Sequence, residues 1–78
     1  MMSDATVLRE RFQYLPPEQV LRAVESALRP RFRHPDVHRL FSTVVTLWIT
    51  GACDVASPPP LPTGVRQQIE ETLERALH

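Results

Sequence analysis

Eight prolines in 78 residues decide where regular structure can begin and end in this chain. Proline fixes its own φ angle and lacks a backbone N–H, and it keeps the residue before it out of the helical region. Prolines are therefore expected at helix starts and in connections, but not inside helices. Their positions divide the sequence into four segments, with the densest proline run just before the last one.

Three of the four segments have the spacing of amphipathic helices. In residues 3–15, 17–29 and 63–77, apolar side chains recur every three or four positions and charged side chains lie between them. Ser3 or Asp4 can accept hydrogen bonds from the free N–H groups of the first turn. We expect a helix over each of these three ranges.

The remaining segment, 36–50, is compatible with two structures. Its apolar side chains suit a helix, and Gly51 is a good C-terminal cap. However, residues 43–46 read Thr-Val-Val-Thr, and β-branched residues favour a strand. No other segment reads as a strand that would pair with it, so we expect a helix, although sequence alone leaves residues 41–50 open. The apolar residues extend around much of the circumference, which predicts the central and most buried helix.

These segments together predict an all-α protein with one small domain over residues 1–78. The expected fold is a bundle of three to four short helices, with a proline-rich linker at 52–62 before the C-terminal helix. The prolines of the linker favour a stiff polyproline II conformation. The linker leaves open whether the C-terminal helix packs on its own chain or on a partner. A chain this short has a thin core, so a partner subunit is the expected supplement.

Composition and charge exclude several classes of protein. Nine arginines balance nine acidic residues, so the chain lacks the overall positive charge of many nucleic-acid-binding domains. Cys53 is the only cysteine, which excludes an internal disulfide and suits a reducing compartment. The N-terminus has no signal-peptide pattern, and no apolar run approaches the roughly 20 residues of a transmembrane helix. We expect a cytoplasmic protein that does not bind membranes.

Metal binding and catalysis have little support in the sequence. His34 and His38 have a zinc-like spacing, but Pro35 separates them and no second ligand pair completes a structural zinc site. Cys53 lacks the flanking signature of an activated nucleophile. A chain of this size hardly encloses a pocket of a few hundred Å³. We therefore expect no catalytic residue, no metal and no cofactor.

The favoured function is protein–protein contact through apolar helix faces, as in an adaptor, an accessory subunit, a chaperone-like protein or an inhibitor. An amphipathic helix fits into a groove on a partner, and an exposed tryptophan often anchors an interface. The predicted contact residues are Val65, Ile69, Leu73, Leu77 and Trp48. We expect a homo-oligomer or membership of a larger complex.

The alternative function is nucleic-acid or phosphate binding through a basic connector at residues 29–39. Arginine side chains bind phosphates, and an aromatic ring in an extended loop stacks on a base. The candidate residues are Arg29, Arg31, Phe32, Arg33 and Arg39. The competing interpretation is that these arginines are solvated or form ion pairs with the acidic last helix.

Overall fold

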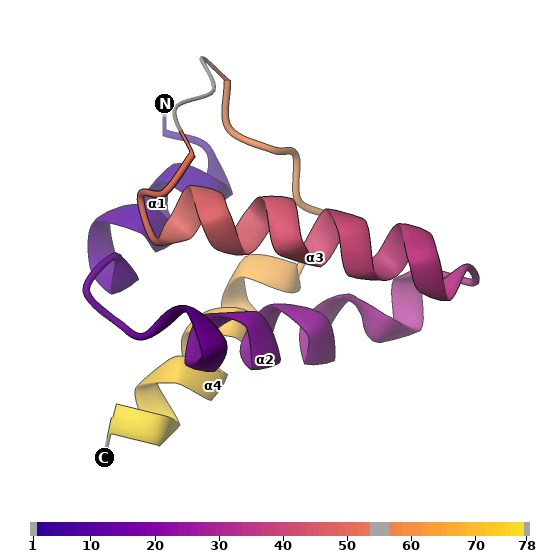
Figure 1. Ribbon diagram of the computed structural model, residues 1–78. Helices are drawn as coiled ribbons and strands as arrows, with labels where there is room; N and C mark the ends of the chain where they lie inside the picture. The colour runs from indigo at the N-terminus through magenta and orange to yellow at the C-terminus, as the bar shows by residue number, and fades with distance from the viewer. Residues whose placement is uncertain (1, 54–56, 78) are drawn as a thin grey trace.

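Four α-helices build the computed structural model of the chain, which describes residues 2–53 and 57–77. They are α1 (Asp4–Phe12), α2 (Pro17–Leu28), α3 (Pro35–Ile49) and α4 (Val65–Leu77), with a 3-10 turn, η1 (Arg29–Arg31), after α2 (Figure 1). No strand occurs in these two described stretches, so the all-α prediction is confirmed. The ambiguous segment is helical through Ile49.

The helices begin where local chemistry favours a start. The Ser3 hydroxyl accepts a hydrogen bond from the backbone N–H of Thr6 and so caps α1. Pro17 and Pro35 lie in the first turns of α2 and α3, where the missing N–H costs no hydrogen bond. α4 begins two residues later than predicted, directly after Gly64, whose φ of +87° favours glycine.

The C-terminus of α1 lies three residues before its predicted boundary at position 15. Leu15 precedes Pro16 and is therefore kept out of the helical region. Its backbone N–H donates instead to the carbonyl of Phe12, which closes a tight turn into α2.

The C-terminus of α3 has the glycine cap that the sequence predicted. Gly51 has a φ of +76°, and its backbone N–H donates to the carbonyl of Trp48. The N–H of Ala52 donates to the carbonyl of Leu47. This pair of bonds is a Schellman motif, which satisfies two of the free carbonyls at the helix end.

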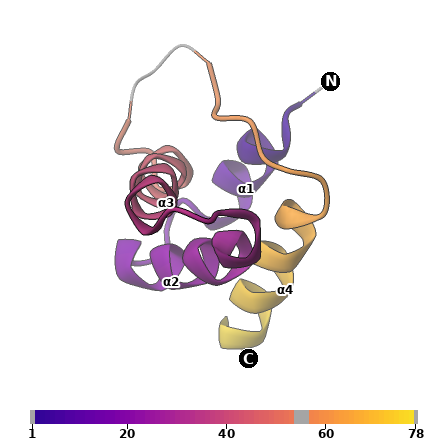
Figure 2. The ribbon, with the colours of Figure 1, turned by 90° about the vertical axis from the view of Figure 1, so that its right-hand side faces the viewer.

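All four helices contribute to one hydrophobic core. α2 packs against both α3 and α4, and α1 contacts the same two helices (Figures 1 and 2). α2 and α3 run in opposite directions, and the His38 ring lies 2.9 Å from the carbonyl of Glu25 between them. The buried apolar residues are Ala5, Leu8, Phe12, Val20, Ala23, Val24, Ala27, Leu28, Val45, Trp48, Ile49, Val65, Ile69 and Leu73.

The C-terminal helix packs on its own chain. Part of the linker before it is described, and there Pro59 is buried and Leu61 packs against the core. Positions 54–56 of the predicted linker lie outside the described residues. Arg31 donates a hydrogen bond of 2.8 Å to the carbonyl of Thr63, which ties η1 to the start of α4. The linker therefore follows the surface of the bundle over its described part.

Candidate protein-interaction face

The predicted contact residues lie mostly in the core. Val65, Ile69 and Leu73 have no exposed surface, and Trp48 is 6% exposed. α4 packs against α1 and α2, and Trp48 of α3 belongs to the same core cluster, so in this fold these side chains are covered by their own chain. Leu77, at 56% exposure, is the one member of the set that faces solvent. The physical reason is that the apolar stripe of α4 completes a core that three short helices leave open.

Trp48 lies between the core and the side of α1. The guanidinium of Arg9 lies over its ring, 4.9 Å from the centroid, in a cation–π contact. The indole Nε1 is buried and has no hydrogen-bond partner among the described atoms. Trp48 is thus a core residue, and the Arg9 guanidinium covers one face of its ring.

The aromatic residue of the basic connector, Phe32, packs against α3. Phe32 is half-buried, with its ring centroid 5.6 Å from that of Phe41 and 5.8 Å from that of His38. Its aromatic face is thus partly covered by the N-terminal half of α3. The Arg31 side chain bonds to the Thr63 carbonyl rather than standing free.

The other arginines of the connector are exposed. Arg29, Arg33 and Arg39 make no ion pair within residues 2–53 and 57–77. The arginines that do pair with the acidic last helix are Arg11 in α1 and Arg66 in α4 itself. The interpretation that the connector arginines neutralise α4 is therefore wrong for the described part of the chain.

The unexpected feature is the outer side of α3. Four large apolar residues on it face solvent: Val37, Leu40, Val44 and Leu47, at 49%, 67%, 37% and 39% exposure. Their spacing of three, four and three residues places them in one stripe along the helix. We call this stripe the α3 outer face. Figure 2 views α3 nearly end-on, with α2 below it and α1 and α4 to its right.

A small hollow borders the α3 outer face on the side of α2. It has a volume of about 260 Å³, and its apolar walls are Pro17, Leu21 and Leu47. Thr43, Thr46 and Glu18 complete the lining. Thr46 is buried, and its hydroxyl has no hydrogen-bond partner among the described atoms. The hollow widens the apolar surface that α3 presents.

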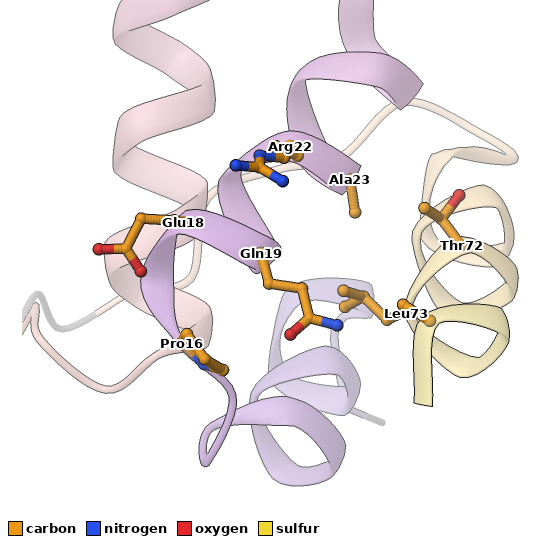
Figure 3. A pocket seen from close by; sticks show the side chains of 8 residues that line it. Pro16, Glu18, Gln19, Arg22, Ala23, Thr72 and Leu73 are labelled. Carbon is orange, nitrogen blue, oxygen red and sulfur yellow. The ribbon is translucent and has the colours of Figure 1, made fainter. Parts of the chain in front are cut away.

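A second, larger concavity lies between α2 and α4. This groove of about 460 Å³ has an apolar floor that includes Ala23 and Leu73, with Gln19, Arg22 and Thr72 at its sides (Figure 3). The groove is open rather than enclosed, so it does not contradict the expectation that the chain hardly encloses a pocket of this volume. The groove is open along its length, and the polar groups that line it are spread over its rim without a nucleophile beside a base.

The potential metal ligands are dispersed. In the part of the chain that is described, no three His, Cys, Asp or Glu side chains gather in a metal-binding group. His34 is exposed, His38 contacts the Glu25 carbonyl, and Cys53 is a partly exposed thiol beyond the end of α3. None of the described helices has both the length and the apolar character needed to cross a bilayer.

Comparison with known proteins returned no match to a protein-family model, to a curated protein or to a solved structure. Function is therefore inferred from the residues and their arrangement. In that respect α3 is the informative element, since the sequence predicted it to be the central and most buried helix, yet four of its large apolar residues are exposed. The regular spacing of Val37, Leu40, Val44 and Leu47 places them on a different side of the helix from Ser42, Val45 and Ile49, but spacing does not say which side is covered.

Proposed function

We propose that this protein is a non-catalytic protein-interaction module whose contact surface is the α3 outer face. The observation that carries the proposal is the set of four exposed apolar side chains at helical spacing, with Leu40 at 67% exposure. Single exposed apolar residues are common on protein surfaces, but a continuous stripe of them is typical of interaction sites.

The contrast with the neighbouring helices supports this choice. The outward positions of α2 carry Glu18, Arg22 and Ser26, all exposed, as expected of a solvated face. The exposed side of α4 is mostly polar, with Gln67, Gln68, Glu71, Thr72 and Arg75, and it has a single exposed large apolar residue, Leu77, in its described part. Of the helices described, α3 is therefore the one whose outer side is unfavourably exposed to water, so that its burial in an apolar contact would lower the free energy.

The hollow beside Leu47 adds shape to this surface. A protruding side chain of a partner would enter between Leu21 and Leu47 and bury apolar area on both of them. A flat stripe buries less area per partner residue than a stripe with a recess. An adaptor, an accessory subunit and an inhibitor would all use such a surface, and they differ only in the partner.

The proposal is tested by comparing three tagged chains recovered from the cells that express them: the unchanged protein, Leu40→Glu and Tyr14→Glu. Both variants add a carboxylate at an exposed apolar position, but Tyr14, at 86% exposure, lies outside the α3 outer face. We expect the retained protein, untagged copies of the same chain included, to fall at least tenfold for Leu40→Glu only. Equal retention by all three chains would overturn the proposal.

Nuclease treatment separates this function from nucleic-acid binding. The three exposed connector arginines, Arg29, Arg33 and Arg39, keep the alternative in view because they have no ion-pair partner in the described part of the chain. We expect the retained protein to survive nuclease and to persist in a chain with all three changed to Gln. Loss of retention in both conditions would favour the basic connector, since phosphate contacts depend on those charges.

A further inference from the structure

We infer that the occupant of the α3 outer face is the α3 outer face of a second copy of this chain, packed antiparallel to the first. This inference rests on the proposed function and names its partner. It is carried by two properties of the face, the symmetry of its spacing and the distribution of charge at its two ends.

The spacing of the stripe reads the same in both directions. From Val37 the steps are three, four and three residues, and from Leu47 backwards they are again three, four and three. In an antiparallel pair, each position therefore meets an apolar position of the other copy. Val37 would lie opposite Leu47 of the second copy, and Leu40 opposite Val44 of the second copy.

This register also pairs side chains of complementary size. Every contact along it joins a leucine to a valine, so that large and small side chains alternate across the interface and interdigitate. A parallel pair would instead place Leu40 against Leu40 and Val44 against Val44 of the second copy. The antiparallel arrangement fills the space along the helices more evenly.

The charges distinguish the two directions more strongly. The N-terminal half of α3 carries the exposed residues Asp36 and Arg39, and exposed Arg33 lies just before the helix, so two arginines against one carboxylate leave this end with a net positive charge. The C-terminal half has no charged residue, but Glu18 of α2 lies beside it at the hollow. Antiparallel packing brings Arg39 of one copy to the end where Glu18 of the other lies. Parallel packing would instead set the two net positive N-terminal ends of α3 side by side.

The expected dimer is weak. Complexes that bury less than about 1,200 Å² are mostly transient, and a stripe of four side chains with its borders lies near that limit. We therefore expect a monomer–dimer equilibrium that depends on concentration rather than a permanent dimer. Sedimentation equilibrium of the purified full chain, from about 1 μM to about 1 mM, covers the range of such affinities.

The first test compares dissociation constants. We expect Leu40→Glu to raise the dissociation constant at least tenfold, because it sets a carboxylate into the apolar centre of both halves. Tyr14→Glu should leave it unchanged, and far-ultraviolet circular dichroism should show the same helix content in all three chains. A monomer at every concentration, or a dimer that persists in Leu40→Glu, would overturn the inference.

The second test fixes the direction of the two helices by disulfide formation in a Cys53→Ser background. Chains with Val37→Cys and chains with Leu47→Cys are oxidised alone and as a mixture. In the antiparallel pair, position 37 lies opposite 47 and about 15 Å from its own counterpart, which is beyond disulfide reach. We expect a mixed disulfide and little self-linked dimer. Self-linked Val37→Cys dimers without the mixed species would overturn the antiparallel arrangement.

Failure of this inference is distinguishable from failure of the proposed function. If the purified chain is monomeric but Leu40→Glu still abolishes retention of another protein, the face binds a different partner and only the second-copy inference is overturned. If the chain is monomeric and Leu40→Glu retains the same proteins as the unchanged chain, both are overturned.

Discussion

Arg11 in α1 and Glu70 in α4 form an ion pair, with Nη1 of the arginine 2.8 Å from Oε2 of the glutamate, although 59 positions separate them in the sequence. The same guanidinium also bonds Glu74, and Arg66 bonds both Glu70 and, at 3.2 Å, Asp4. Glu70 is thus shared by two arginines. This network holds the C-terminal helix against the N-terminal one and directs its apolar stripe inward.

Neutralising Glu70 should therefore loosen α4. We expect Glu70→Gln to lower the free energy of unfolding by about 1 kcal/mol, the upper part of the range for partly exposed ion pairs, with the loss reduced at high salt. Glu71→Gln is the matched control, because Glu71 is exposed and, among the described residues, its carboxylate accepts only a weak hydrogen bond of 3.5 Å from Gln67. Urea denaturation followed by Trp48 fluorescence gives both values. Equal losses for the two variants would argue against a stabilising network.

The core position of Ile69 predicts a large effect of truncation. We expect Ile69→Ala to destabilise the protein by about 2–5 kcal/mol, as for other buried large-to-small changes. Leu77→Ala, on the same stripe but 56% exposed, should change stability by less than about 0.5 kcal/mol. Thermal denaturation at matched concentration measures both. Similar small effects at the two positions would mean that α4 is not docked as described.

The left-handed backbone at Gly51 predicts an ordered series of substitutions. At a φ of +76°, a side chain strains the backbone, so we expect Gly51→Ala to cost about 1 kcal/mol. Gly51→Asn should cost less, because asparagine tolerates this region, and Gly51→Val should cost more. A Cβ atom at position 51 would lie 3.8 Å from Nη2 of Arg9, which is an ordinary van der Waals contact. The cost therefore reflects the backbone conformation rather than a clash. Urea midpoints in any other order would contradict this cause.

The buried hydroxyl of Thr46 predicts a stabilising substitution. Because Thr46 Oγ1 has no hydrogen-bond partner among the described atoms, its desolvation is not compensated. We expect Thr46→Val, which keeps the shape, to raise the free energy of unfolding by about 1 kcal/mol. Thr43→Val, at an exposed position where the hydroxyl bonds the Arg39 carbonyl at 2.9 Å, serves as the control and should not stabilise. A loss of stability in Thr46→Val would indicate that the hydroxyl has a partner after all.

Much of the fold was predictable because it depends on neighbours in the sequence. The prolines at 16, 17 and 35, the Ser3 cap and the Gly51 cap act within one turn of the helix that they bound, so their effect follows from residue type. The helix starts were accordingly close to those observed. The errors lie at the end of α1 and the start of α4, where single residues decide whether the terminal turn of the helix forms.

The candidate site was not predictable in the same way, and α3 shows why. Val37 and Val45 are equally apolar, and periodicity alone shows that α3 has two apolar sides without saying which one is covered. The answer depends on where α1, α2 and α4 pack, and only the tertiary structure places them. Likewise, the spacing of the apolar stripe of α4 suits a partner-binding surface, but in the tertiary structure most of its residues lie in the core.

The sequence by itself determined the helical class, the number of segments and most of their boundaries, because those follow from short-range backbone geometry and capping. The tertiary structure alone decided which apolar stripe became core and which stayed exposed. The reason is that four short helices have too little surface in contact with one another to bury all of their apolar side chains. The stripe of α4 was covered in this way, and the α3 outer face stayed exposed.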